Sequence, residues 1–198
     1  MDTLEGALDI GVRWLTVFAF STENWRRPAS EVRFLMNFNE RLLLRRREEL
    51  IERGVRVRTI GRRPGRIPRR LLRRMEETEA LSARNKALNL TFAFDYGGRA
   101  EIVDAARKIA AEAVAGELDP RRITDRTIAR HLYDPHMPDP DLLIRTSGEH
   151  RLSNFLLWES AYTELVFTPV LWPDFRRDDL FDAIREYQRR ERRYGKVR

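Results

Sequence analysis

Short apolar runs alternate along the chain with longer segments in which apolar residues recur every three or four positions. The run at residues 14–20 is dense in β-branched and aromatic side chains, which predicts a strand buried on both faces. At residues 55–60 apolar and polar positions alternate, as is typical of a half-buried strand. Shorter apolar runs predict further strands at residues 88–94, 142–144 and 165–167.

Helical patterns separate these strands. They predict helices at residues 2–11, 31–53, 68–84, 100–115, 124–132 and 177–193. The second of these precedes Gly54, a suitable residue for a helix C-terminus. Its apolar side chains form one face: Val32, Leu35, Met36, Phe38, Leu42 and Leu43. We expect this face to belong to the core, and any cavity that it lined would suit a long hydrocarbon.

Strands that alternate with helices predict an α/β fold, with a central, mostly parallel β-sheet flanked by helices. The 198 residues contain no repeat and no linker-like segment, so we expect a single domain over residues 1–198. Ligands of such sheets bind beyond the carboxyl ends of the strands. Three polar loops follow predicted strands: 21–27, 95–99 and 145–153.

The loop from Arg145 to Ser153 has the richest chemistry. Arg145 and Arg151 offer planar forks for phosphate oxygens, and the segment 154–158, which we expect to be helical, would add free backbone N–H groups. These features suit a diphosphate site. The alternative is structural, with Arg145 paired to Glu149 and Ser153 capping the helix. Residue types alone leave both interpretations open.

Two other features have weaker signals. The loop Ser21–Pro28 could bind an anion beside an apolar surface, but it could equally be a capped helix start. Glu164 lies between apolar residues and could be a Mg²⁺ ligand, although a salt-bridged carboxylate is the commoner role. Taken alone, both features favour the structural interpretation.

The net charge of +7 and the pI of about 10.3 favour anionic partners: phosphorylated molecules, nucleic acid or an acidic membrane surface. We expect the arginine clusters at 45–47, 62–74 and 189–193 mainly to coat helix faces. The chain has no cysteine, and its three histidines lack the spacing of a zinc site. No secretory signal or long apolar segment is visible, so we expect a cytoplasmic protein.

Five motifs, in order, resemble those of the cis-prenyltransferases, the family of undecaprenyl and decaprenyl diphosphate synthases. They are LTVFAFSTENW at 15–25, YGGR at 96–99, IRTSGEHRLSNFLLW at 144–158, AYTEL at 161–165 and LWPDF at 171–175. The resemblance covers essentially the whole chain. It implies a homodimeric α/β isoprenyl transferase that condenses isopentenyl diphosphate with an allylic diphosphate, such as farnesyl diphosphate, to give a cis-polyprenyl diphosphate with the help of Mg²⁺.

The same resemblance assigns roles to individual residues. Arg145, Arg151 and Ser153 would bind isopentenyl diphosphate, with Glu149 orienting the arginines. Glu164 would be a metal ligand. The remaining residues would lie at the reacting diphosphates. Asn24 and Arg27 would take part in catalysis. Substrate binding would involve Ser21, Trp25, Arg27 and Glu31. The product would extend into an apolar tunnel.

The resemblance has one gap. Family members begin with a strand and an MDGNGRWA-like loop whose aspartate binds Mg²⁺ and the allylic diphosphate, and we find no counterpart in these 198 residues. We therefore expect a fold without that first strand, in an N-terminally shortened form of an active enzyme. The alternatives are a non-catalytic subunit or inactive fragment, or a basic module that binds nucleic acid or an acidic membrane surface. Our expectation is peripheral contact with the membrane and no nucleic-acid binding.

Overall fold

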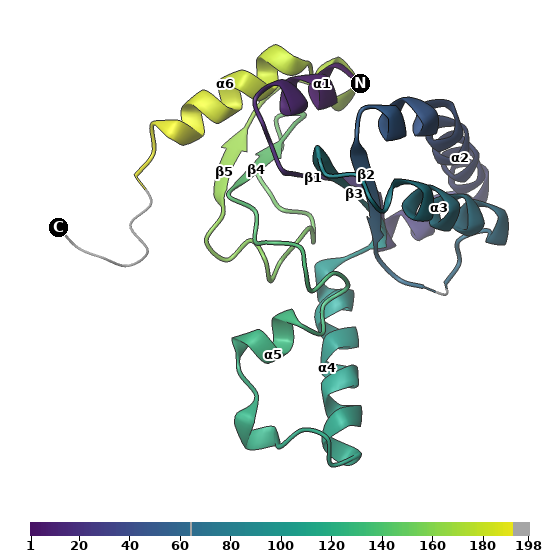
Figure 1. Cartoon of the computed structure of the whole chain (residues 1–198), viewed down its shortest axis with the longest axis vertical. Helices are drawn as coiled ribbons and strands as arrows, with labels where there is room; N and C mark the ends of the chain where they lie inside the picture. The colour runs from purple at the N-terminus through teal and green to yellow at the C-terminus, as the bar shows by residue number, and fades with distance from the viewer. Residues whose placement is uncertain (64, 192–198) are drawn as a thin grey trace. The chain divides into compact units, whose positions relative to one another are not determined.

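The computed structural model describes residues 1–63 and 65–191 (Figure 1). The chain divides into two compact units. The first unit contains Met1–Val12 and the chain from Pro138 onward, and the second contains Arg13–Met137. A single domain over 1–198 stays a prediction.

The second unit is built on a three-stranded parallel sheet with the order β1-β3-β2. Its elements are β1 (Trp14–Ser21), η1 (Thr22–Arg26), α2 (Ala29–Glu52), β2 (Val55–Ile60), α3 (Arg69–Ser82), β3 (Leu88–Tyr96), α4 (Gly98–Val114), η2 (Pro120–Arg122) and α5 (Asp125–Ala129). Parallel strands need crossover connections. Helices α2 and α3 provide them, and they pack against each other and against β2 (Figure 1). Parallel strands flanked by helices confirm the predicted α/β class.

Burial within this sheet differs from the prediction. Strand β1 was expected to be buried on both faces, but Phe20 is its only buried residue. The reason is position, because β1 lies at the edge of the three-stranded sheet and β3 lies at its centre. Most of β3 is accordingly buried, from Leu88 to Tyr96. The continuous apolar run therefore does not distinguish a central strand from an edge strand.

The core of the second unit joins the sheet to α2 and α3. It contains Phe20, Met36, Ile67, Leu71, Met75 and Phe94. Phe20 stacks on Phe94 at a centroid distance of 5.4 Å. The predicted apolar face of α2 is only partly in this core, since Phe38 and Leu42 are exposed. A helix that packs along one narrow strip leaves its flanking positions open to solvent.

Gly61 allows the chain to turn sharply after β2. Its φ of +138° lies in a region that L side chains rarely adopt, and an added Cβ would lie 1.9 Å from the carbonyl oxygen of Phe94. Only glycine fits this position without moving β3. The loop that follows is held by a hydrogen bond from the backbone N–H of Arg62 to the carbonyl oxygen of Asp95 (3.3 Å).

The first unit combines a two-stranded parallel sheet with two helices. Its elements are α1 (Asp2–Asp9), β4 (Leu142–Arg145), β5 (Glu164–Phe167), η3 (Trp172–Asp174) and α6 (Arg177–Gln188). Helix α1 packs on α6. Arg177 joins the two helices through carboxylates of α1, namely Asp2 (2.8 Å), Glu5 (2.9 Å) and Asp9 (3.2 Å).

Three helix predictions need correction. The segment 154–158 is not helical, because Asn154 and Leu156 have φ values of +64° and +45°, and the chain forms turns there. Helix α5 ends at Ala129, not at residue 132, and α6 ends at Gln188. The arginines at 192 and 193 lie outside the described residues. The remaining predicted strands and helices are observed with shifts of a few residues at their ends.

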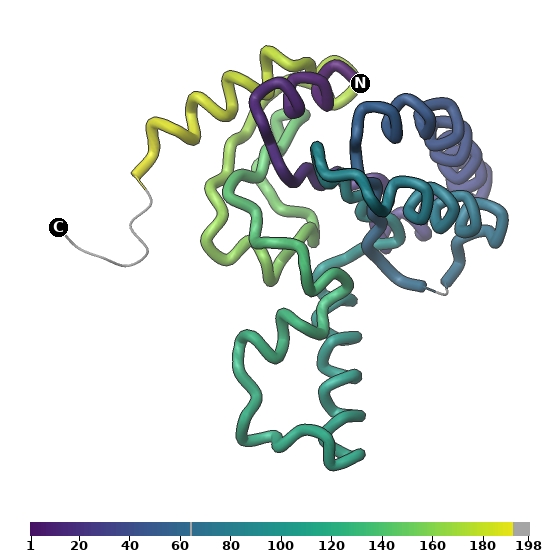
Figure 2. Tube along the Cα trace, viewed as in Figure 1, coloured from purple at the N-terminus to yellow at the C-terminus, as the bar shows by residue number. Residues whose placement is uncertain are grey.

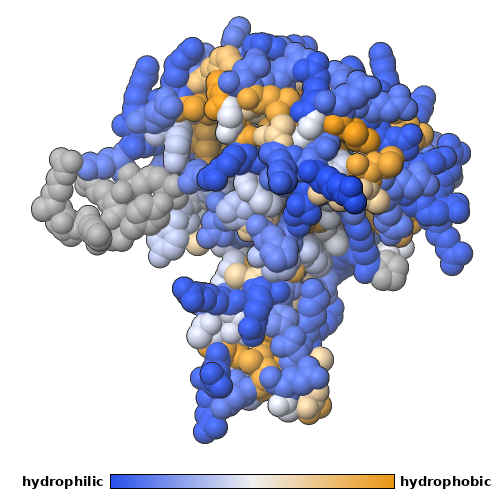
Figure 3. Space-filling model, viewed as in Figure 1, coloured by the Kyte–Doolittle hydropathy of each residue, from blue (hydrophilic) through white to orange (hydrophobic). Residues whose placement is uncertain are grey.

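The backbone trace in Figure 2 follows the long connection from α4 through η2 to α5, which stays within the second unit. Hydrophilic residues dominate the molecular face drawn in Figure 3, and apolar side chains appear there in smaller patches. Within the residues that the structure describes, no helix is both long and apolar enough to span a membrane.

Candidate functional site

The loop after β4 is fixed to the segment that follows β5. The N–H groups of Ser147 and Gly148 donate to the carbonyl oxygens of Val170 (2.8 Å) and Thr168 (2.9 Å). In return, the N–H of Thr168 donates to the carbonyl oxygen of Arg145 (2.9 Å). Both Ser147 and Gly148 are in left-handed conformations, with φ values of +70° and +67°. The backbone path that carries the two loop arginines is thus held at several points.

The two arginines of this loop differ in their environment. The Nε group of Arg145 is buried and has no hydrogen-bond partner among the described residues. Arg151 is 62% exposed and forms an ion pair with Glu149. The alternative in which Arg145 pairs with Glu149 is therefore wrong, and Glu149 contacts one arginine of the loop. A buried guanidinium N–H without an acceptor is costly, and an anionic ligand would supply that acceptor.

Ser153 and His150 are two further residues of the loop. Ser153 has a φ of +51° and lies in a turn. Because no helix follows it, the interpretation of Ser153 as a helix cap is wrong. The ring of His150 stacks on Phe167 of β5, with centroids 4.7 Å apart. Anion binding here must come from arginine side chains and turn N–H groups, because no helix N-terminus follows.

Glu164 begins β5 and is held by an arginine of the same unit. Its carboxylate accepts a hydrogen bond from Arg190 at 2.9 Å, and Arg190 also donates to the carbonyl oxygen of Leu165 (2.8 Å). The side chain of Glu164 is 28% exposed. Glu164 therefore has the ion pair of the structural interpretation, with part of its carboxylate accessible to solvent.

The second group of predicted residues lies at the carboxyl end of β1. The side-chain oxygen of Asn24 accepts the N–H of Ser21 (2.8 Å), and the carbonyl oxygen of Asn24 accepts the N–H of Arg27 (3.1 Å). Asn24 thereby bonds to the residues on both sides of the short helix η1. Arg27 forms an exposed ion pair at 2.5 Å with Glu31, which lies in the first turn of α2.

Trp25 connects this loop to β3. Its indole N–H donates to the carboxylate of Asp95 (2.6 Å), and its ring meets Phe20 edge-on at 4.9 Å. Asp95 is buried, and burial raises the pKa of its carboxyl group, while the Trp25 hydrogen bond and nearby arginines act in the opposite direction. Asp95 also has a φ of +49°. This residue fixes the position of Trp25 at the strand ends.

The predicted site residues are thus distributed over the two units. Ser21, Asn24, Trp25, Arg27 and Glu31 lie in the second unit, whereas Arg145, Glu149, Arg151, Ser153 and Glu164 lie in the first. Within each unit the residues lie at or near the carboxyl ends of parallel strands, with Glu164 at the start of β5.

Four buried acids were not among the predicted site residues, and two of them, Asp95 and Glu101, lie close to strand ends of the second unit. Asp95 belongs to one of the three predicted strand-end loops, so its location could be read from the sequence but not its bond to Trp25. Glu101 lies in the first turn of α4, where it accepts hydrogen bonds from the hydroxyl of Tyr96 and the N–H of Tyr133. Burial raises the pKa of Glu101. An acid in the first turn of a helix ordinarily interacts with the helix dipole, so no sequence signal marks its burial.

The described residues do not form a complete metal site. No group of three or more His, Cys, Asp or Glu side chains in residues 1–63 and 65–191 could hold an ion. Glu164 could supply one carboxylate, and a Mg²⁺ ion commonly takes the rest of its ligands from substrate phosphates and water.

Fold and loops together define an α/β protein whose strand ends present arginines suited to phosphorylated substrates. A family model described as "Putative undecaprenyl diphosphate synthase" matches residues 1–195. The chain belongs to this family, the cis-prenyltransferases, and is an isoprenyl transferase.

Individual relatives agree with this assignment. A trans,polycis-polyprenyl diphosphate synthase of Thermobifida fusca, described as specific for (2Z,6E)-farnesyl diphosphate, is 55% identical over 98% of this chain and 68% of its own length. The decaprenyl diphosphate synthase of Mycobacterium leprae is 50% identical over 98% of this chain and 66% of its own. The crystal structure of lavandulyl diphosphate synthase from Lavandula x intermedia, in complex with dimethylallyl diphosphate, is 40% identical. That comparison has a TM-score of 0.95 and covers 98% of this chain and 84% of the other.

Proposed function

We propose that this isoprenyl transferase condenses isopentenyl diphosphate with an allylic diphosphate, such as farnesyl diphosphate, to form a cis-polyprenyl diphosphate. The observation that carries the proposal comes from the loop 145–153. The guanidinium Nε of Arg145 is buried there and has no described partner, and the exposed Arg151 follows six residues later. A diphosphate offers several acceptor oxygens to two such forks. Arg145, Arg151 and Ser153 bind the isopentenyl diphosphate, and Glu149 orients Arg151.

The reaction needs stabilisation of negative charge on the leaving group. When the allylic carbon–oxygen bond breaks, positive charge develops on carbon and negative charge on the departing diphosphate. The new carbon–carbon bond forms to isopentenyl diphosphate, which then loses a proton. Fixed cationic donors at the diphosphate stabilise this charge separation, and in our proposal Arg27, in the loop after β1, has that role.

The remaining residues of that loop position the substrate in our proposal. Asn24 fixes the η1 turn, Ser21 and Glu31 flank it, and Trp25 offers an apolar ring beside the core. An apolar surface suits the hydrocarbon part of the substrate, because each buried CH₂ contributes roughly 0.8 kcal/mol. Chain growth would then be favoured by burial of each added isoprene unit.

We further propose that Mg²⁺ assists the reaction, with Glu164 as its protein ligand. The ion pair of Glu164 with Arg190 uses one of its oxygens, and the partial exposure of the side chain supports access by an ion. Our proposal also includes a homodimer and a cytoplasmic location with peripheral contact at the inner face of the membrane. The net charge of +7 supports attraction to an anionic lipid surface.

Binding and turnover measured side by side test this function. The protein is titrated with isopentenyl diphosphate by calorimetry and is separately incubated with labelled isopentenyl diphosphate, farnesyl diphosphate and Mg²⁺. We expect binding and a butanol-extractable labelled product, which EDTA abolishes. Binding without product would instead support a non-catalytic subunit, and absence of both would refute the proposal.

A further inference from the structure

The second unit contains a basic pocket that the proposed function does not use. The pocket has a volume of about 810 Å³, within the usual range for small-molecule sites. It is lined by Thr59, Ile60, Gly61, Arg62, Arg63, Asp104, Arg107, Lys108 and Tyr133. These residues come from the end of β2, one face of α4 and the segment after α5. In the sheet order β1-β3-β2, the pocket follows β2, whereas the loop with Trp25 follows β1.

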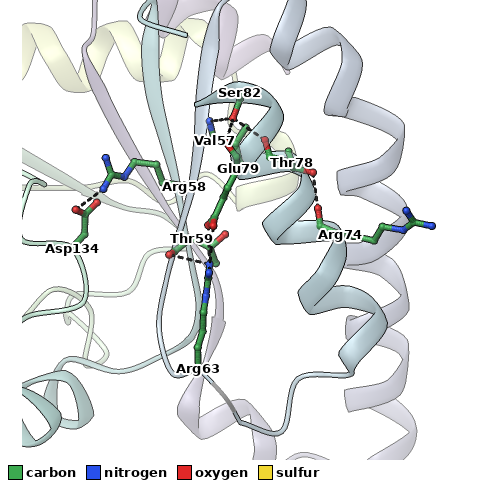
Figure 4. A network of polar contacts seen from close by, with 9 residues as sticks. All are labelled: Val57, Arg58, Thr59, Arg63, Arg74, Thr78, Glu79, Ser82 and Asp134. Atoms are coloured by element: carbon green, nitrogen blue, oxygen red, sulfur yellow. Dashed lines mark hydrogen bonds and ion pairs between the residues drawn. The ribbon is translucent and has the colours of Figure 1, made fainter. Parts of the chain in front are cut away.

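Most of the cations in this pocket lack a carboxylate of their own. Arg63 is the exception, because it pairs with Glu79 at 2.7 Å and also donates to the carbonyl oxygen of Thr59 (Figure 4). Lys108 donates to the carbonyl oxygen of His131 (3.1 Å), and no carboxylate of a described residue lies within ion-pair distance of its ammonium group. Three cations of the pocket therefore remain for a ligand: Arg62, Arg107 and Lys108.

Two of these cations, Arg62 and Arg107, share one carboxylate, Asp104. Its oxygens lie 2.9 Å from Arg107 and 3.7 Å from Arg62, and it accepts a hydrogen bond from the hydroxyl of Tyr133 (2.7 Å). Burial and Asp104 both raise the pKa of the Tyr133 hydroxyl, so this group stays protonated and neutral. Three cations and one anion leave an excess of two positive charges around the cavity.

The geometry of these groups suits a ligand with a phosphoryl group. Arg107 is 71% exposed and Arg62 is 45% exposed, so both guanidinium groups retain N–H donors that face solvent. Asp104, Arg107 and Lys108 lie at spacings of three and four residues and thus on one face of α4. Gly61 also lines the pocket, and its lack of a side chain lets the backbone after β2 pass close to the end of β3. Arginine forks and an ammonium group around a polar cavity are typical of phosphate recognition.

We propose that this pocket is a second anion site, which binds the phosphoryl group of a phosphorylated molecule through Arg62, Arg107 and Lys108. The proposal goes beyond the proposed function, since none of these residues belongs to the loop 145–153 or to the loop after β1. The ligand is either a soluble phosphate or diphosphate ester or the phosphate headgroup of a lipid. Both present the same chemistry to the pocket.

The first experiment locates the binding of inorganic diphosphate by NMR in the absence of metal. We expect the backbone amide signals of Gly61, Arg62, Lys108 and Tyr133 to shift with a common saturation curve. Signals from the loop 145–153 report separately on the proposed isopentenyl diphosphate site, so failure of one site is distinguishable from failure of the other. Absence of shifts in the four pocket signals at millimolar diphosphate would overturn the proposal.

Charge-matched variants make the test specific. Arg107→Gln/Lys108→Gln removes two exposed cations from the pocket, and we expect at least a tenfold loss of affinity at the pocket signals. Arg121→Gln/Arg122→Gln removes the same charge from η2, outside the pocket, and we expect less than a twofold change. Equal losses in both variants would show non-specific attraction to the net charge and would refute the site.

Vesicle flotation distinguishes the two sources of the ligand. Phosphatidylcholine vesicles with and without phosphatidic acid are mixed with the protein and its two double variants. Binding to phosphatidic acid that depends on the pocket pair and not on the η2 pair would identify a lipid headgroup. Diphosphate binding without such flotation would identify a soluble ligand, and loss of neither signal in the pocket variant would contradict the proposal.

Discussion

The hydrogen bond between Trp25 and Asp95 predicts a large difference between two substitutions at position 95. Asp95→Ala removes the acceptor of the indole N–H, which lies 2.6 Å from the carboxylate. Loss of a hydrogen bond to a charged group, with its donor left half-buried, costs about 2 kcal/mol of unfolding free energy. Asp95→Asn keeps an oxygen acceptor and a side chain that tolerates the φ of +49°. We therefore expect Asn to cost less than about 1 kcal/mol at pH 7.

The pH dependence gives a second, independent check. Burial raises the pKa of Asp95 above its unfolded value, so the folded state binds the proton more tightly than the unfolded state. The stability associated with this group is therefore fully present below the unfolded pKa of 3.8 and is lost as the pH rises through the raised folded pKa. Asp95→Asn removes this dependence. Its unfolding free energy should improve relative to the wild type as the pH rises from 4 to 7, a range of about three units.

Urea denaturation followed by far-UV circular dichroism measures both effects. The wild type, Asp95→Ala and Asp95→Asn are compared at several pH values, with equal slopes against urea as the control for unchanged unfolding behaviour. If the Ala and Asn variants have the same unfolding free energy within about 0.5 kcal/mol, the hydrogen bond to Trp25 does not hold the loop, and the reasoning is refuted.

Three further predictions concern other parts of the chain. Arg145→Gln should weaken the binding of isopentenyl diphosphate roughly 10- to 100-fold in calorimetry, as expected for loss of a charge-assisted hydrogen bond of about 1.5–3 kcal/mol. Arg185→Gln on α6 should leave this binding unchanged. Equal affinities of the two variants would contradict the role of Arg145. Gly61→Ala should lower the free energy of unfolding by more than about 2 kcal/mol, because its Cβ would lie 1.9 Å from the carbonyl oxygen of Phe94, and a thermal midpoint equal to that of the wild type would disprove this close approach. Burial raises the pKa of Glu101, so Glu101→Gln should flatten the loss of wild-type stability between acidic and neutral pH in the same urea assay, and an unchanged pH profile would exclude Glu101 as its source.

Hydrophobic periodicity was sufficient to predict the order and type of nearly all elements. The alternation at 55–60 coincides with β2, and the run at 165–167 lies within β5. These predictions succeed because strand and helix periods reflect which side chains face the core. The depth of burial of each strand was harder to predict from the sequence, since edge and central strands of this sheet have similar apolar runs.

The segment 154–158 shows where local pattern fails. Its consecutive large apolar residues favoured a helix, but Leu156 is buried within a series of turns with positive φ values. Those backbone conformations are imposed by packing around the segment and not by its own propensity. The correction matters for function, because it removes a helix N-terminus from the proposed diphosphate site.

Residue types and motif order predicted which residues to examine at the site, but not their partners. The ion pair of Glu164 with Arg190 joins residues far apart in the sequence. Loop geometry determines that Glu149 pairs with Arg151 and not with Arg145. The basic pocket likewise combines a strand end, a helix face and a distant tyrosine. Such contacts are set by tertiary structure, so a single sequence does not contain a visible signal for them.

The most direct test of the central claim is a calorimetric titration of the protein with isopentenyl diphosphate, compared with Arg145→Gln/Arg151→Gln and with Arg185→Gln. We expect saturable binding to one site that is lost in the double variant and retained in the α6 variant. Binding of equal strength in all three proteins, or no binding to the folded wild type, would contradict the assignment of the loop 145–153 as the diphosphate site.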